Sequence, residues 1–144
     1  MIRLTKNPEP AVLANKKESW TADYTSGDPQ RADAVKQNYR HPDIKAAIVE
    51  ETHEKCAYCE SKVRHVDFGD VEHIVPKAHR PGLIFDWNNL TLSCKVCNNN
   101  KRDYYDPSAP LLNPYTDDPG IHLKFFGPRL LSKPTKSRGE LTVN

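Results

Sequence analysis

No run of apolar residues in this chain of 144 residues approaches the ~20 that a membrane-spanning helix needs. The N-terminal segment also lacks the apolar stretch of a secretory signal, so we expect a cytoplasmic protein without a membrane partner. Internal repeats and low-complexity tracts are missing from the sequence as well. The chain is polar, with a mean hydropathy of −0.76 and 28% charged residues, and this predicts about one domain with a modest apolar core.

A strong excess of charge of one sign is also missing. The net charge is only +2, which does not by itself indicate a nucleic-acid partner. One segment departs from this balance, because residues 124–138 carry five basic side chains and no acidic one. Such a segment is usually a solvated tail or loop, and contact with phosphate or with a partner protein is the alternative.

Proline positions and apolar spacing divide the chain into three parts, and together they predict an α+β fold. Residues 1–55 are expected to form an N-terminal arm and helices, with helical segments over 11–20, 30–40 and 42–54. Residues 106–144 are rich in proline and are expected to be irregular, apart from one strand over 123–126.

The middle part, residues 56–105, is expected to contain the functional core. Two short strands are predicted over 63–68 and 71–75, joined by a tight turn at Gly69-Asp70. A further turn is predicted over 86–90, and a helix is predicted to open at the second cysteine pair and to run through Lys101.

Cysteine is scarce, yet its four residues stand in two matched pairs with 34 residues between them, Cys56-x-x-Cys59 and Cys94-x-x-Cys97. Zinc accepts four thiolates in a tetrahedron at ~2.3 Å, and each Cys-x-x-Cys turn brings two sulfurs together. In a reducing compartment such pairs indicate metal ligands rather than disulfides. We therefore predict a closed, structural zinc site, with four unligated thiols as the alternative.

Residues with reactive side chains lie inside this cysteine frame. A histidine at the end of a strand, as predicted for His73, can take a proton from water because its pKa lies near neutrality. The carboxylate of Glu72 and the side-chain oxygen of Asn98 suit Mg²⁺, which prefers oxygen ligands. Lys77 and Lys101 are candidates for contact with phosphate, although each alone is an ordinary exposed residue.

The order of these motifs resembles the HNH branch of the ββα-metal nucleases. The resemblance covers residues 56–103, about a third of the chain, and is carried by Cys56-Ala-Tyr-Cys59, Glu72-His73-Ile74-Val75-Pro76, Asn89-Leu90 and Cys94-Lys-Val-Cys97-Asn98-Asn-Asn-Lys101. It implies a small ββα core stapled by zinc, with His73 as general base and with Glu72 and Asn98 as ligands of a catalytic Mg²⁺ or Mn²⁺. It also implies that Asn89 braces the loop and orients the histidine.

Two positions depart from the commoner family pattern. Glu72 stands where Asp is more frequent, which adds a methylene and shifts the carboxylate, and Asn98 stands where His is the other frequent residue. The second departure makes this an H-N-N variant of the motif.

A narrower resemblance points to the HNH subunit of Septu and retron-associated anti-phage systems. It rests on Cys56-Ala-Tyr-Cys59-Glu60, Gly69-Asp-Val-Glu-His73 with Pro76-Lys77, Asp86-Trp87-Asn88-Asn89-Leu90 and Pro110-Leu-Leu-Asn-Pro114. Members of that family work beside an ABC-type (SMC-like) ATPase, and their chains usually continue past the end of this one. The resemblance implies a nuclease acting on DNA or on an RNA such as tRNA. A non-catalytic zinc-ribbon module that binds nucleic acid or a protein partner is the alternative.

Overall fold

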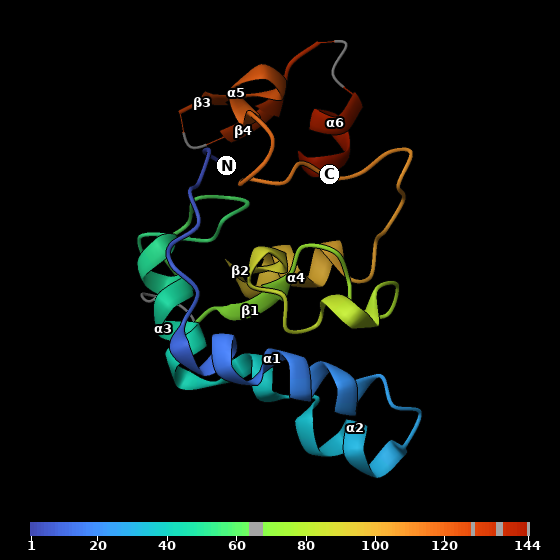
Figure 1. The fold of residues 1–144 in the computed structure, drawn as a ribbon. Helices are drawn as coiled ribbons and strands as arrows, with labels where there is room; N and C mark the ends of the chain where they lie inside the picture. The colour runs from blue at the N-terminus through green and yellow to red at the C-terminus, as the bar shows by residue number, and fades with distance from the viewer. Residues whose placement is uncertain (64–67, 128, 135–136, 144) are drawn as a thin grey trace.

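The computed structural model describes residues 1–63, 68–127, 129–134 and 137–143. Three regions follow one another across the molecule (Figure 1). The N-terminal helices lie at one end, a pair of strands with one helix lies in the middle, and a C-terminal group of short elements lies at the other end. Among the described residues, no helix is both long enough and apolar enough to cross a membrane.

The N-terminal region is helical, with α1 (Ala11–Tyr24), α2 (Pro29–Val35), the 3₁₀ turn η1 (Asn38–Arg40) and α3 (Pro42–Glu51). Local signals explain where these helices begin. The Asp28 carboxylate caps α2, and Pro42 occupies the first turn of α3, where a missing amide hydrogen costs nothing. The helices predicted here are confirmed, although α1 continues four residues further, the segment 30–40 is divided between α2 and η1, and α3 ends at Glu51, three residues before the predicted end.

The middle region contains β1 (Asp70–His73), η3 (Pro81–Leu83), η4 (Trp87–Asn89), β2 (Leu90–Ser93) and α4 (Lys95–Lys101). The two strands are antiparallel, with Asp70 opposite Ser93 and His73 opposite Leu90. The helix α4 follows β2 directly and packs on β1. Two strands and a helix in this order confirm the predicted α+β fold with a ββα core.

The pairing of the strands differs from the prediction. The second predicted strand is present as β1, but its partner is β2, which was not predicted and which follows the turn predicted over 86–90. Residues 64–67 of the first predicted strand lie outside the described residues, and Val63 and Phe68 are not in a strand. Gly69 has a φ of +63°, and a Cβ there would lie 2.9 Å from the Leu92 side chain, so the chain reaches β1 at a position that requires glycine.

The C-terminal region is more regular than predicted. The strand β3 (Leu123–Phe126) has the predicted bounds, but it pairs with β4 (Arg129–Ser132) and is flanked by α5 (Pro119–His122) and α6 (Ser137–Val143). The prediction of irregular structure is therefore wrong for most of 119–143. Pro119 opens α5, and the other prolines of this region that the structure describes lie outside its helices and strands, where they do not interrupt hydrogen bonding.

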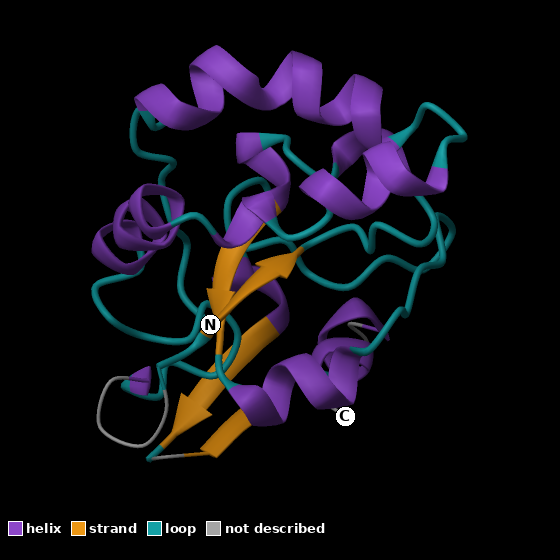
Figure 2. Cartoon of the chain, turned by 90° about the horizontal axis from the view of Figure 1, so that it is seen from below, coloured by secondary structure: helices purple, strands orange, loops and turns teal. Residues whose placement is uncertain are grey.

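The core joins the N-terminal and middle regions. Leu13 of α1, Ile44 and Ile48 of α3, and Leu90 and Leu92 of β2 are fully buried in one apolar cluster. Figure 2 shows helices on several sides of the strands, and the buried pair is β1–β2, whereas β3 and β4 are largely exposed. Burial of such side chains contributes about 1.5–3 kcal/mol each, so the strand that precedes α4 is held firmly against the N-terminal helices.

Candidate active site

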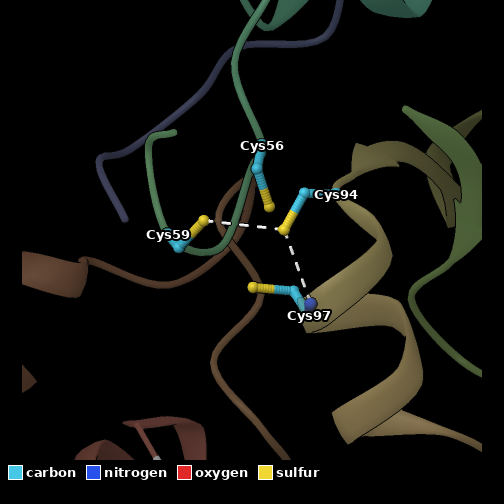
Figure 3. Close-up of side chains that lie close together, drawn as sticks. All are labelled: Cys56, Cys59, Cys94 and Cys97. Atoms are coloured by element: carbon cyan, nitrogen blue, oxygen red, sulfur yellow. Dashed lines mark hydrogen bonds between the residues drawn. The ribbon is translucent and has the colours of Figure 1, made fainter. Parts of the chain in front are cut away.

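The four cysteines converge on one point. Their sulfur atoms all lie within 4.8 Å of one another, and Cys59 Sγ and Cys94 Sγ are 3.8 Å apart. Figure 3 shows the four side chains pointing inward, two from the loop after α3 and two from the start of α4. A tetrahedron with metal–sulfur bonds of ~2.3 Å has edges of about 3.8 Å. The cluster therefore has the size and the donor set of a four-thiolate metal site, as predicted, and this set is characteristic of zinc.

This cluster also positions α4 against the strands. Cys94 is the N-cap residue of α4, and its sulfur accepts a hydrogen bond from the Cys97 amide at 3.4 Å. The loop with the first cysteine pair is tied to β2, because the amide of Ala57 donates to the carbonyl of Leu92 at 2.9 Å. A metal bound here would link the loop after α3 to the start of α4.

His73 ends β1 and is 6% exposed. Its Nε2 lies 3.0 Å from the carbonyl oxygen of Ile84. A carbonyl only accepts hydrogen bonds, so Nε2 carries the hydrogen and Nδ1 is the nitrogen with a free lone pair. Burial lowers the pKa of His73 to about 4; the bond to Ile84 opposes this shift, and the nearby charges of Lys77, Lys101 and Arg40 add to it. The ring is therefore neutral at pH 7, with Nδ1 able to accept a proton.

Glu72, the preceding residue of β1, faces α4. Its Oε1 accepts a hydrogen bond from Lys101 Nζ at 2.7 Å, and both side chains are nearly buried. Burial raises the pKa of Glu72, and the Lys101 ammonium opposes that rise. The pair keeps a carboxylate in place beside His73.

Asn89 connects the loop after β1 to the 3₁₀ turn before β2. Its side-chain oxygen accepts from the amide of Val75 at 2.8 Å, and its side-chain nitrogen donates to the carbonyls of Val75 at 3.0 Å and of Leu83 at 3.2 Å. Leu83 immediately precedes Ile84, whose carbonyl holds the His73 ring. The contacts of Asn89 are therefore those of a brace for the loops on both sides of the histidine.

Comparison with known proteins gives the same assignment to this part of the chain. Residues 56–103 match the family model of the HNH endonucleases. The chain is also 34% identical to the Septu protein PtuB of Bacillus thuringiensis over 145 aligned residues, which include all of this chain and 53% of that protein. The chain is thus similar to the Septu proteins, and residues 56–103 are similar to the HNH endonucleases.

A second Septu protein PtuB, from Bacillus mycoides, is 29% identical over 188 aligned residues, which include 99% of this chain and 61% of that protein. The chain of this Septu-like protein thus spans little more than half the length of either relative. The HNH match begins at Cys56 and ends at residue 103, so it includes both cysteine pairs, the strands β1 and β2 between them, and α4.

Asp70 is a site residue that the sequence analysis missed. Asn98 Nδ2 donates to Asp70 Oδ2 at 2.9 Å, so the amide contacts Asp70 rather than Glu72 in this structure. Asp70 and Glu72 are two residues apart on β1 and therefore lie on the same face of the strand, the face that contacts α4. The alternation of acids at positions 70 and 72 was the signal available in the sequence.

The two lysines that were predicted to contact phosphate differ in their surroundings. Lys101 is buried, and in addition to Glu72 it donates to the backbone oxygen of His73 at 2.9 Å. Lys77 is half-buried, and its Nζ lies 3.4 Å from the hydroxyl of Tyr39. Lys101 is thus an internal cation in this structure, whereas Lys77 reaches the surface beside the histidine.

Proposed function

We propose that this Septu-like HNH protein is a metal-dependent endonuclease that hydrolyses phosphodiester bonds in nucleic acid. The observation that supports this most directly is the hydrogen bond from His73 Nε2 to the Ile84 carbonyl. It selects the tautomer in which Nδ1 is the proton acceptor, and it holds the ring in one orientation. A general base needs both properties.

The groups around His73 assist the transfer of a proton from water to its ring. Nδ1 takes a proton from the attacking water, and the resulting positive ring is stabilised by the Ile84 carbonyl that already accepts from Nε2. Asn89 holds Val75 and Leu83, which lie in the loops on the two sides of the His73 ring. His73 is therefore the catalytic residue of the proposal, and Asn89 is a positioning residue.

Oxygen donors for a hard divalent cation lie where β1 faces α4. Glu72 and Asn98 are the proposed ligands, with Asp70 beside them, and two carboxylates and an amide oxygen suit Mg²⁺ or Mn²⁺. When bound, such an ion supplies charge stabilisation at the phosphate and at the leaving oxygen. The four cysteines are proposed to hold structural zinc, because four thiolates leave no open coordination position.

The similarity to Septu proteins supports a more specific role. We propose that this chain is the nuclease subunit of an anti-phage defence complex with an ABC-type ATPase, as its resemblance to that family implies. DNA is the favoured substrate because HNH enzymes favour it, and tRNA or another RNA is the alternative. The support for this role is the similarity over the whole chain to two Septu proteins.

The test is cleavage of plasmid DNA and of total tRNA by zinc-loaded wild type and by the His73→Ala variant. Each is incubated with Mg²⁺, with Mn²⁺ and with EDTA, and bound zinc is quantified before and after, so that loss of the structural metal is not mistaken for loss of the catalytic one. His53→Ala, which removes an exposed histidine, is the matched control. Cleavage by wild type and the control, but not by His73→Ala, is the expected result.

If wild type cuts neither substrate by itself, the same assay is repeated with the ATPase partner present. If the complete complex cuts neither substrate, the nuclease proposal is wrong, and the chain is then better described as a zinc-ribbon binding module. If His73→Ala cuts as fast as wild type, the base has been assigned to the wrong residue.

A further inference from the structure

A tyrosine from outside the HNH match lies against the proposed catalytic histidine. Tyr39 belongs to η1 in the N-terminal helical region, and its ring centroid is 4.6 Å from that of His73, with the two planes at 68°. The Tyr39 side chain is buried in the core cluster, so the ring is fixed by packing. An edge-to-face contact of this kind orients the histidine from the side of the N-terminal helices.

Two cations converge on the same tyrosine. Lys77 Nζ lies 4.7 Å from the ring centroid, within the range of a cation–π contact, and it also donates to the Tyr39 hydroxyl. The guanidinium carbon of Arg40 lies 5.4 Å from the same centroid. One of these charges comes from η1 and the other from the loop after β1, so the tyrosine brings together cations from two regions of the chain.

Neither charge is paired with an acid in the part of the chain that the structure describes. Among the residues that the structure describes, no carboxylate lies within ion-pair distance of Arg40 or Lys77. Other lysines and arginines, such as Lys6, Arg31 and Arg138, do have such partners. Arg40 is exposed and Lys77 is half-exposed, so both charges are available to a ligand from solvent.

We propose that Arg40 and Lys77 form a phosphate-binding site for the nucleic-acid backbone beside His73, and that Tyr39 is the positioning residue that holds Lys77 there. The inference rests on the proposed nuclease function and adds to it. It assigns substrate binding to η1, a segment that precedes the HNH match. Cations that engage phosphates fix the register of the backbone and carry no base specificity, so the site serves any sequence.

The test is the salt dependence of binding, because each phosphate contact contributes about 0.9 to the slope of log affinity against log salt on duplex DNA, and about 0.7 on a single strand. The probes are a short fluorescein-labelled DNA duplex and a labelled single-stranded RNA, titrated with zinc-loaded protein in the absence of Mg²⁺ and Mn²⁺. Arg40→Gln and Lys77→Gln are each expected to weaken binding several-fold. Each is also expected to reduce the slope by the contribution of one phosphate contact, measured on whichever probe wild type binds.

The charge-conserving variants Arg40→Lys and Lys77→Arg are expected to restore the slope. Lys16→Gln removes an exposed lysine of α1 and is expected to change neither slope nor affinity. In steady-state cleavage, Arg40→Gln and Lys77→Gln are expected to raise KM more than they lower kcat. Thermal unfolding of every variant is measured alongside as a control for folding. A loss of binding with an unchanged salt slope would indicate a structural defect and would overturn the proposal.

Tyr39→Phe tests the positioning role separately, because it keeps the ring and removes the hydroxyl that accepts from Lys77. It is expected to weaken binding in wild type but to have no further effect in the Lys77→Gln background. An equal effect in both backgrounds contradicts this role of Tyr39.

Cleavage by wild type together with unaltered slopes in Arg40→Gln and Lys77→Gln overturns the phosphate site and leaves the nuclease function standing. A wild type that neither binds nor cleaves, alone and in the complete complex with the ATPase partner, overturns both.

Discussion

The ammonium group of Lys101 lies 2.7 Å from the carboxylate of Glu72 and donates a second hydrogen bond, at 2.9 Å, to the backbone oxygen of His73. One side chain at the end of α4 therefore holds two consecutive residues of β1. The helix is in turn attached to the cysteine cluster through its N-cap residue Cys94. The cysteine cluster, the helix and the proposed site thus form one connected unit, and the predictions below test its parts.

Loss of the Lys101 cation is expected to destabilise the fold. Lys101→Met leaves Glu72 buried without its partner, and breaking a buried ion pair in this way typically costs about 3–5 kcal/mol. The measurement is the free energy of unfolding in urea, with Lys16→Met as an exposed control for which about 0.5 kcal/mol or less is expected. A Lys101→Met variant as stable as the control would show that the pair contributes nothing to the fold.

Removal of the metal from the cysteine cluster is expected to unfold the ββα core. Apparent zinc binding in small domains contributes about 10–16 kcal/mol to folding, which matches or exceeds the net stability of an ordinary domain. Elemental analysis should find about one zinc per chain, because one four-thiolate cluster is present among the described residues. Cys94→Ser should lose this zinc and the cooperative melting transition together, and a folded variant without zinc would contradict the structural role.

Truncation of Asn89 is expected to loosen the loop beside the histidine. Asn89→Ala removes three side-chain hydrogen bonds and leaves backbone groups of Val75 and Leu83 unpaired, at a cost of about 1–3 kcal/mol for a buried group. Hydrogen exchange at the Val75 amide should accelerate, and cleavage should slow. Asn88→Ala, in the same 3₁₀ turn but exposed, should leave both unchanged. Equal rates of hydrogen exchange at the Val75 amide in the two variants would show that Asn89 does not brace this loop.

The buried histidine is expected to make stability depend on pH. Its pKa is about 4 in the folded chain against 6.5 for an ordinary histidine, so between these values the unfolded state binds more protons than the folded state. Stability therefore rises with pH across this window, by about 3 kcal/mol in total, and is lost on acidification. The check is the free energy of unfolding from pH 4 to 7 in wild type and in His73→Ala. The rise should be smaller in the variant by this amount, and parallel curves would show that His73 is not buried as a neutral base.

Much of the local structure was predictable because its signals are contained in short segments. The proline at the start of α3 and the apolar spacing of Ile44 and Ile48 predicted a helix that the structure contains. The strand Leu123–Phe126 was predicted with its observed bounds. The pairing of β1 with β2 was not predictable in this way, because the two strands are separated by a connection that holds two 3₁₀ turns and no repeated pattern.

The sequence by itself determined which side chains are available for chemistry in this protein. Two spaced cysteine pairs specify a four-thiolate metal site, and the acid, histidine and asparagines between and after them specify the residue types of the HNH motif, since spacing and side-chain type are local properties. Only the tertiary structure decided which groups meet. It placed Asn98 on Asp70, Lys101 on Glu72, and Tyr39 against His73. These contacts join residues far apart in the chain, and they depend on how α4 and the N-terminal helices pack against one short pair of strands.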